Sequence, residues 1–264
     1  CDVRGFTTIS ESFKSDPQGL TKLINRFLTP LTNEIINVNG TIDKYMGDCI
    51  MAFWNAPIDV DGHEKMACDA TLRMHKAMAE LNGIREEEAK SENKKFLELK
   101  IGIGLNTGGC VVGNMGSDQR FDYSVLGDSV NLAARLEGQS KSYGVKTVIG
   151  PETNDSVKDI YATLQLDMIA VKGKKEAVTI FTLAGDTEFK NSSEFKNLEI
   201  KHKKILENYF SQKWDTCLKE MNLAKNLCNN LMNEYYNIMA LRIVEYKKSP
   251  PPDNWDGVYV ATSK

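Results

Sequence analysis

Apolar side chains recur every three or four residues over three long stretches of the chain. This spacing predicts helices at residues 18–38, 62–90 and 128–143. Pro30 falls within the first stretch and should kink the helix or mark its boundary, because proline has no N–H to donate to the preceding turn. Gly144 follows the third stretch and is suited to ending a helix. Three long amphipathic helices are therefore expected.

Shorter apolar runs between these helices predict strands. Residues 41–54 contain two such runs on either side of Met46-Gly47-Asp48, which predicts a β-hairpin with an acidic side chain at its tip. Residues 1–9 are expected to form a strand end followed by a tight glycine turn. The remaining expected elements are a turn, strand and turn at residues 108–116, a short helix at 151–159 and strands at 97–105, 147–149, 161–171 and 178–183. This order predicts an α+β fold with a mixed sheet.

The character of the sequence changes after about residue 185. Residues 186–194 are polar and typical of a linker. Residues 195–264 predict two or three amphipathic helices, followed by a proline-rich tail at 249–257 that is expected to be extended. We therefore expect a domain over residues 1–185, the linker, and a small helical C-terminal extension over residues 195–264.

The composition is that of a soluble globular protein. Hydrophobic residues make up 41% and charged residues 26% of the 264 residues. A net charge of −3 argues against a nucleic-acid-binding protein, which usually carries a basic excess or stripe. No run of 18 apolar residues occurs, so nothing in this sequence is expected to span a membrane. The chain opens on Cys1 in a strand-like segment, so we expect a fragment of a longer protein.

The cysteines and histidines give no sign of a metal or nucleophilic site. The six cysteines form no CxxC pair and follow no disulfide spacing, which favours reduced thiols and a cytoplasmic location. The histidines are scattered at positions 63, 75 and 202. Isolated histidines of this kind usually lie on the surface or in helix packing, so a His-based metal site or a Ser/His/Asp triad has little support.

Two aspartates beside glycine turns are candidate metal ligands. Asp2 lies at a predicted strand end and Asp48 at the predicted hairpin tip. Mg²⁺ prefers one or two carboxylates together with substrate phosphates, although an aspartate in a glycine turn is more often a turn former. Residues 4–8 (RGFTT) follow Asp2 directly, and a glycine turn that leads toward a helix exposes backbone N–H groups that can cradle phosphate.

Two further polar groups could bind a nucleotide. Asn131 and Arg135 are four residues apart on one face of a predicted helix, where an amide and a guanidinium could reach a ribose and a phosphate. The alternative is a surface polar pair. Residues 172–175 (KGKK) lie between two predicted strands and could supply cations to a triphosphate, or could form a simple basic turn.

In their order along the chain, these segments resemble one family closely. Five segments look like the successive signature blocks of class III adenylate/guanylate cyclase catalytic domains: residues 1–8 (CDVRGFTT), 43–57 (DKYMGDCIMAFWNAP), 102–116 (GIGLNTGGCVVGNMG), 116–137 (GSDQRFDYSVLGDSVNLAARLE) and 171–181 (VKGKKEAVTIF). The resemblance covers about residues 1–184. It implies a ferredoxin-like βαββαβ-type core with a mixed or antiparallel sheet.

The resemblance implies a metal site at the two aspartates. Asp2 and Asp48, assisted by the carbonyl of Val3, would hold two Mg²⁺ or Mn²⁺ ions in each active site. One ion would lower the pKa of the ribose 3′-hydroxyl and orient it toward the α-phosphorus, and the other would hold the β- and γ-phosphates.

The resemblance also implies a triphosphate and ribose site. The phosphates would be cradled by the backbone N–H groups of Gly5, Phe6 and Thr7. Lys172 matches the family's triphosphate lysine, and Asn131 would position the ribose. Arg135 would stabilise the charge that develops on the α-phosphate, a role whose loss costs about 10²–10³ in rate.

Lys44 and Ser124 match the positions that choose the base in this family. A lysine at the first position suits adenine, since Lys is a donor only and adenine N1 is an acceptor, whereas guanine presents donors there. Ser124 departs from the usual aspartate or threonine but keeps a hydroxyl that can accept from the adenine 6-amino group. The resemblance therefore implies an adenylate cyclase that converts ATP to 3′,5′-cyclic AMP and pyrophosphate in signal transduction.

Sites of this family form between two domains. One chain here carries both the metal- and base-binding residues and the Asn131–Arg135 pair, which implies a homodimer with two equivalent sites. Two alternatives stay open: a guanylate cyclase, against which Lys44 argues, and a catalytically silent domain that binds nucleotide for regulation. Silent relatives usually lose a metal aspartate or the Asn/Arg pair, and this sequence has all four.

The C-terminal segment resembles that of one group of cyclases. Residues 195–260, ending in PPPDNWDG, are similar to the extension of bacterial sensor-linked (CHASE2-type) adenylate cyclases. This similarity implies a full-length protein in the bacterial inner membrane, anchored through a preceding region, with its catalytic end in the cytoplasm.

Overall fold

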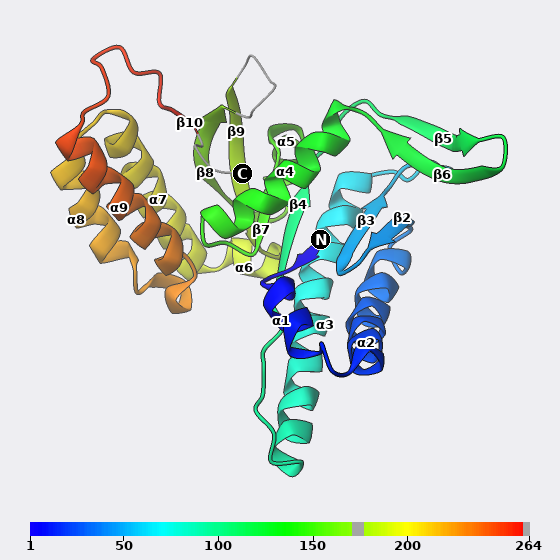
Figure 1. Ribbon diagram of the computed structural model, residues 1–264. Coiled ribbons are helices and arrows are strands. Elements are labelled where there is room, and N and C mark those ends of the chain that lie inside the picture. The colour runs from blue at the N-terminus through cyan, green and yellow to red at the C-terminus, as the bar shows by residue number, and fades with distance from the viewer. Residues whose placement is uncertain (171–176, 261–264) are drawn as a thin grey trace. The chain divides into compact units, whose positions relative to one another are not determined.

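The computed structural model describes residues 1–170 and 177–260, and the structural statements below concern those residues (Figure 1). They fall into two compact units, one formed by residues 1–103 with 108–131 and the other by residues 104–107 with 132–264. Helices and strands are mixed in both, and the strand pairs include antiparallel and parallel ones. The expected α+β class with a mixed sheet is confirmed.

The first unit is built from helices, two hairpins and a short strand pair. Its elements are β1 (Asp2–Val3), α1 (Phe6–Ser12), α2 (Pro17–Ile36), β2 (Thr41–Met46), β3 (Cys49–Phe53), α3 (His63–Ser91), the start of β4 (Ile101–Leu105), β5 (Val111–Ser117), β6 (Arg120–Leu126) and the start of α4 (Asp128–Ser142).

Helix α2 shows how local chemistry sets an element here. Asp16 caps its N-terminus by accepting from the Gly19 N–H at 2.9 Å, and Pro17 occupies the first turn, where no N–H is needed. Phe27 and Leu31, one turn apart, lie on the buried face. The helix continues through Pro30 rather than ending there.

Strand pairing in the first unit holds the hairpins and the N-terminus. Strand β2 pairs antiparallel with β3 around Gly47, whose φ of 67° is a left-handed conformation that favours glycine, and Asp48 follows it at the tip. Strands β5 and β6 form the second hairpin. Strand β1 pairs antiparallel with β4, with Asp2 opposite Gly102. The hairpin expected at residues 41–54 is confirmed.

The second unit contains a sheet with strand order β4-β7-β9-β8-β10 and the helices that pack on it. Besides the remainders of β4 and α4, its elements are β7 (Thr147–Ile149), α5 (Pro151–Val157), β8 (Ala162–Ala170), β9 (Ala177–Gly185), α6 (Thr187–Asn191), α7 (Ser193–Phe210), α8 (Trp214–Ala224), the 3₁₀ helix η1 (Leu227–Asn230), α9 (Asn233–Lys248) and β10 (Val258–Val260).

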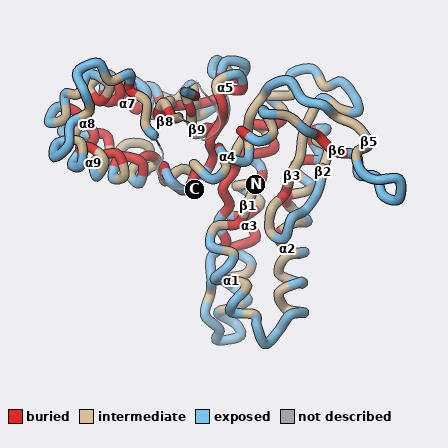
Figure 2. The backbone as a smooth tube through the Cα atoms, turned by 45° about the horizontal axis from the view of Figure 1, so that its top comes forward, coloured by how far each residue is buried: buried red, intermediate tan, exposed pale blue. Residues whose placement is uncertain are grey.

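One continuous core runs through the second unit. It joins the buried face of α4, the sheet and the C-terminal helices, and includes Leu132, Leu136, Leu164, Ile180, Phe195, Ile205 and Met239. Figure 2 shows buried residues on β8 and on the inner sides of α7 and α9. The last strand, β10, pairs parallel with β8, so the chain returns to the sheet after the helices.

The sequence predicted the long elements and missed short ones. All three long helices and the expected strands after residue 140 are present, within a few residues of their predicted ends. Helix α1 replaces most of the expected glycine turn, β4 begins only at Ile101, and β6 and β10 were not predicted. Helix α6 lies within the predicted linker. No helix among the described residues is long and apolar enough to cross a membrane.

His202 is buried in the second unit and uses both ring nitrogens. Its Nε2–H donates to the Gln165 carbonyl oxygen at 2.6 Å, and Nδ1 accepts from the Tyr236 hydroxyl at 3.0 Å. Because a carbonyl oxygen can only accept, this arrangement requires the neutral Nε2–H tautomer. Burial lowers the pKa of His202 to about 4.

Protonation of His202 should therefore destabilise the protein in acid. The neutral imidazole contributes stability that is present above the unfolded pKa of roughly 6.5 and is lost as pH falls through the folded value, in all about 3 kcal/mol. Urea unfolding should show a free energy that falls more steeply between pH 6.5 and pH 4 for wild type than for His202→Gln. His63→Gln, at a partly exposed histidine, should follow wild type. Equal slopes for wild type and His202→Gln would contradict the assignment.

Candidate functional site

Backbone pairing brings Asp2 and Asp48 together although 45 residues separate their segments in the chain. The Cys1 amino group donates to the Ile50 carbonyl oxygen at 3.0 Å, and the Ile50 N–H donates to the Cys1 carbonyl oxygen at 2.8 Å. The Val3 N–H donates to Asp48 Oδ2 at 3.2 Å. As a result, the Asp48 carboxyl forms a side-chain hydrogen bond with that of Asp2.

The two carboxyl groups are electrostatically strained. Burial raises the pKa of Asp48 to about 7, and the hydrogen bond and negative charge of Asp2 act in the same direction. Two carboxyls that share a proton can instead share a cation, which relieves their repulsion. A pair of carboxylates fits Mg²⁺ or Mn²⁺, because these ions take one or two carboxylate ligands and complete their coordination with water and substrate phosphates.

The segment after Asp2 forms a short helix, α1, whose N-terminus has no side-chain cap. Gly5 has φ of 67°, a left-handed conformation that other residues adopt only under strain, and helix α1 begins at Phe6. The Gly5 carbonyl accepts from the N–H groups of Thr8 and Ile9, at 3.0 and 3.3 Å. No side chain caps this terminus. The preceding N–H groups, including that of Thr7, are the ones that a helix leaves without internal partners and that can bind an anion.

Lys44 and Ser124 both contact Asp43, a residue to which the sequence analysis assigned no role. The Lys44 ammonium donates to Ser124 Oγ at 3.4 Å and forms an ion pair with Asp43 Oδ1 at 3.1 Å. The Ser124 hydroxyl donates to Asp43 Oδ2 at 2.8 Å, and the Val125 N–H donates to the same oxygen at 3.1 Å. Asp43 therefore fixes the orientation of the Ser124 hydroxyl and leaves its oxygen as an acceptor.

Asp43 reaches this place because of a β-bulge. Ile42 pairs with Ala52 and Lys44 with Met51, so Asp43 is the additional residue of β2. Its side chain is fully buried, whereas that of Lys44 is 43% exposed. The only sequence signal was an acidic residue next to Lys44, and its meaning depends on the register of the hairpin.

Asn131 and Arg135 share the exposed side of helix α4. Both are exposed, whereas Leu132 and Leu136 are 3% and 0% exposed on the core side of the same helix. The Asn131 N–H is bound by the Gly127 carbonyl at 3.2 Å, which closes the first turn. Asn131 is the last residue of the first unit, and Arg135 belongs to the second. Lys172 lies outside the described residues.

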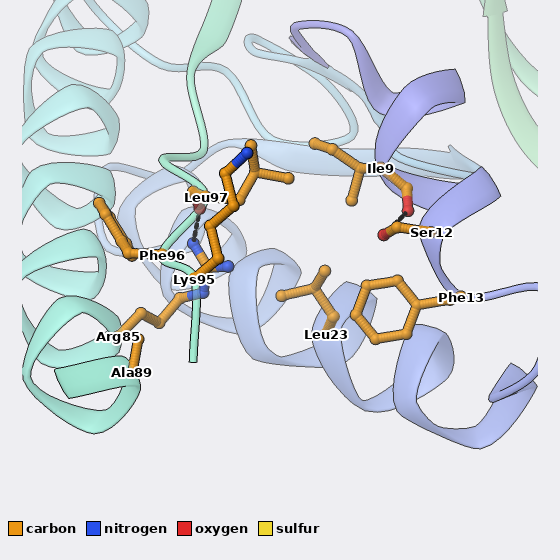
Figure 3. Close-up of a pocket in the computed structure, with 9 residues that line it drawn as sticks. All are labelled: Ile9, Ser12, Phe13, Leu23, Arg85, Ala89, Lys95, Phe96 and Leu97. Carbon is orange, nitrogen blue, oxygen red and sulfur yellow. Dashed lines mark hydrogen bonds between the residues drawn. The ribbon is translucent and has the colours of Figure 1, made fainter. Parts of the chain in front are cut away.

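A cavity of about 190 Å³ lies elsewhere in the first unit. It is lined from α1, α2, α3 and residues 95–97, and Figure 3 shows Arg85 bound to the Leu97 carbonyl oxygen at its edge, at 2.8 Å. None of the predicted site residues lines this cavity. The predicted site residues lie instead at a strand end, at a hairpin tip, on strands β2 and β6, in the first turn of α1 and on helix α4.

Comparison with known proteins identifies the family of this chain. Residues 1–185 match the family described as Adenylate and Guanylate cyclase catalytic domain. An adenylate cyclase of Anabaena cylindrica is 34% identical over 185 residues, which are 69% of this chain and 35% of that protein. Adenylate cyclase 1 of Rhizobium meliloti is 28% identical over 193 residues, which are 73% of this chain and 28% of that protein. The chain spans about a third of the length of these curated relatives.

Solved structures give the same picture. The adenylyl cyclase CyaB from P. aeruginosa has 36% identity and a TM-score of 0.58, over 68% of this chain and 88% of that chain. The guanylyl cyclase Cya2 has 31% identity and a TM-score of 0.59, over 72% of this chain and 91% of that chain. Because an adenylyl cyclase and a guanylyl cyclase resemble this chain to a similar degree, the preferred purine has to be argued from individual residues.

Replacing Asp48 by asparagine should distinguish two effects of this carboxylate, its destabilisation of the fold and its binding of a metal ion. At pH 8 the Asp48 carboxyl, with its pKa raised to about 7, is ionised next to Asp2. Since Asp48→Asn removes that repulsion, the variant in EDTA should unfold at a higher temperature than wild type. Mn²⁺ should raise the unfolding temperature of wild type and leave that of Asp48→Asn unchanged. Asp59→Asn, at an exposed carboxylate, should respond like wild type. Stabilisation of Asp48→Asn by Mn²⁺ would exclude Asp48 as a ligand.

Proposed function

Because the chain belongs to the family of adenylate and guanylate cyclase catalytic domains, we propose that it converts ATP into 3′,5′-cyclic AMP and pyrophosphate. The expected family and cyclase core fold are confirmed by the match over residues 1–185 and by the similar solved structures. The choice of ATP, the roles of individual residues and the assembly of the site are the proposal.

Asp2, Asp48 and the Val3 carbonyl are the groups that would hold two Mg²⁺ or Mn²⁺ ions. Their support is the pairing of the two carboxyls and the raised pKa of Asp48, which is about 7. When bound, such ions lower the pKa of the ribose 3′-hydroxyl and neutralise charge on the phosphates. A cation bound between the two carboxyl groups would favour the ionised form of Asp48.

The remaining polar groups would orient the substrate. The first-turn N–H groups of Gly5, Phe6 and Thr7 would bind phosphate oxygens, as would Lys172. Asn131 would hold the ribose so that its 3′-hydroxyl faces the α-phosphorus. Arg135 would donate to the non-bridging α-phosphate oxygens, on which negative charge grows in the transition state. The 3′-oxygen would bond to the α-phosphorus while the bond from that phosphorus to the bridging oxygen of pyrophosphate breaks, and the 3′-hydroxyl proton would pass to water.

The observation that carries the choice of ATP is the Lys44–Asp43–Ser124 cluster. The Ser124 hydroxyl donates its hydrogen bond to Asp43, so the lone pairs of the Ser124 oxygen would be offered to the base as an acceptor. Lys44 beside it is a donor. One donor and one acceptor side by side match the N1 acceptor and 6-amino donor of adenine.

Guanine would meet this cluster with the wrong pattern. Its O6 is an acceptor where Ser124 offers an acceptor, and its N1–H is a donor where Lys44 offers donors. Each unpaired polar group costs about 1–3 kcal/mol, so two mismatches would favour ATP over GTP by at least tenfold.

Assembly and context extend the proposal. We propose a homodimer in which the aspartates, Lys44 and Ser124 of one copy face Asn131 and Arg135 of the other. We also propose residues 1–185 as the catalytic domain, followed by the linker at 186–194 and the extension at 195–264. The similarity of that extension to sensor-linked bacterial cyclases supports a full-length membrane protein that signals from the cytoplasmic side.

An assay with purified protein and Mn²⁺ should yield cyclic AMP from ATP at least ten times faster than cyclic GMP from GTP. Because Lys44 would face the donors of guanine, Lys44→Glu should lower the ATP rate and narrow or reverse this ratio. Asp48→Ala should form no product, and Asp59→Ala should keep wild-type activity. Chromatography of the nucleotides measures all four.

Two outcomes of this assay would contradict the proposal. Cyclic GMP as the main product of wild type would identify a guanylate cyclase. No product from either nucleotide, in a protein that still binds ATP, would identify a silent regulatory domain.

Mixing two inactive variants should restore activity if the site is shared between copies. Asp48→Ala and Arg135→Ala each damage both sites of their own homodimer. In an equal mixture half of the dimers combine the two variants, and one of the two sites in each is then intact, which gives about a quarter of wild-type activity. Cyclic AMP production by the mixture tests this. A mixture no more active than the sum of its components would show that each site uses one chain alone.

A further inference from the structure

A buried ion pair joins the C-terminal extension to the sheet of the second unit. The Asp167 side chain on β8 is fully buried, and the Arg242 side chain on α9 is 10% exposed and donates to Asp167 Oδ2. The Tyr143 hydroxyl donates to the same oxygen at 2.6 Å, and the Met168 N–H donates to Oδ1 at 2.9 Å.

The other groups around Arg242 keep it in place. Its Nη2 donates to the Tyr143 hydroxyl at 3.3 Å, and its Nη1 donates to the Tyr209 hydroxyl at 3.2 Å. Its guanidinium lies 3.5 Å from the ring centroid of Tyr259 on β10. Burial alone would lower the pKa of Arg242, but the charge of Asp167 raises it above its usual value. Burial raises the pKa of Asp167, and the three donors that converge on its carboxylate act in the opposite direction.

The cluster acts on the end of helix α4, because Tyr143 is the first residue after that helix. The Tyr143 N–H donates to the Gln139 carbonyl at 2.9 Å, and the Tyr143 ring stacks on Tyr235 of α9 with centroids 6.3 Å apart. Gly144 follows with φ of 62°, and a Cβ placed there would lie 2.4 Å from Cγ of Glu234, also on α9. Helix α9 therefore touches the end of α4 at three places.

The same helix α4 is held closely along its length. A Cβ added at Gly104 on β4 would lie 2.2 Å from the Ala133 carbonyl oxygen, so strand and helix backbones meet directly. Leu132 and Leu136 are buried in the core that α4 shares with the extension. The rotation of α4 about its axis is thereby fixed, and this rotation sets the direction in which exposed Arg135 projects.

We propose that the C-terminal extension is a positioning element of the catalytic site, and that Arg242 acts, through Asp167 and Tyr143, by holding the end of α4 so that Arg135 meets the α-phosphate. Arg242 is a positioning residue and does not touch the substrate. The inference rests on the proposed function, since it assigns a cause to the placement of a catalytic side chain.

The test compares Arg242→Met with Lys247→Met, a matched change on the same helix at an exposed ion pair with Asp215. Misplacement of a catalytic group from a distance can cost up to about 100-fold in rate, so we expect kcat to fall about 10- to 100-fold in Arg242→Met with little change in KM for ATP. Lys247→Met should equal wild type. Tyr143→Phe, which removes only the bridging hydroxyl, should be intermediate and covers the case in which Arg242→Met does not fold.

A double-mutant cycle separates positioning from simple loss of stability. In an Arg135→Ala background the guanidinium to be positioned is absent, so adding Arg242→Met or Tyr143→Phe should change kcat less than about twofold. An equal loss in both backgrounds, or wild-type kcat in folded Arg242→Met, would overturn the inference while leaving the proposed function intact. A wild-type protein that forms no cyclic nucleotide would instead overturn the proposed function and this inference with it.

Discussion

The candidate site depends on one short piece of backbone pairing. The exchange of two hydrogen bonds between Cys1 and Ile50 sets β1 beside the tip of the β2–β3 hairpin and forces the carboxyls of Asp2 and Asp48 together. These hydrogen bonds stabilise the fold, but they also hold two carboxyl groups next to each other, which is unfavourable. A cation or a proton bound between the two carboxyl groups would relieve this repulsion.

Much of the fold could be predicted because its long elements carry strong periodic signals. Helices α2, α3 and α4 each have an apolar face and a polar face, which gives a regular spacing of apolar residues in the sequence. Gly47 indicates the tip of the hairpin on which Asp48 lies. Helix α1 has seven residues, too few for a period to emerge. Strand β6 was missed because most of its side chains are exposed on both faces, which removes the alternation that reveals a strand.

The residues of the candidate site also fall into two groups, those that the sequence indicated and those that only the structure reveals. Resemblance to a family supplied roles for residues that match its motifs, and the fold brings two of these pairs into contact, Asp2 with Asp48 and Lys44 with Ser124. Asp43 could not be found from the sequence, because its position depends on a bulge that only the register of β2 and β3 reveals. Likewise, the polar cluster around Arg242 joins residues that lie about a hundred positions apart, and no short motif records it.

The position of strand β10 at the end of the described chain leaves one edge of β8 without its partner strand during synthesis. It pairs with β8 through Val258 and Met168, so the partner of that sheet edge is synthesised ninety residues later. At roughly 5–20 residues per second, the ribosome leaves the β8 edge uncovered for roughly 5–20 s. An open strand edge is where nascent chains pair wrongly with one another. Helices α7 to α9 lie between the two strands in the sequence and are local structures that can form within that interval. Their packing then brings β10 next to β8.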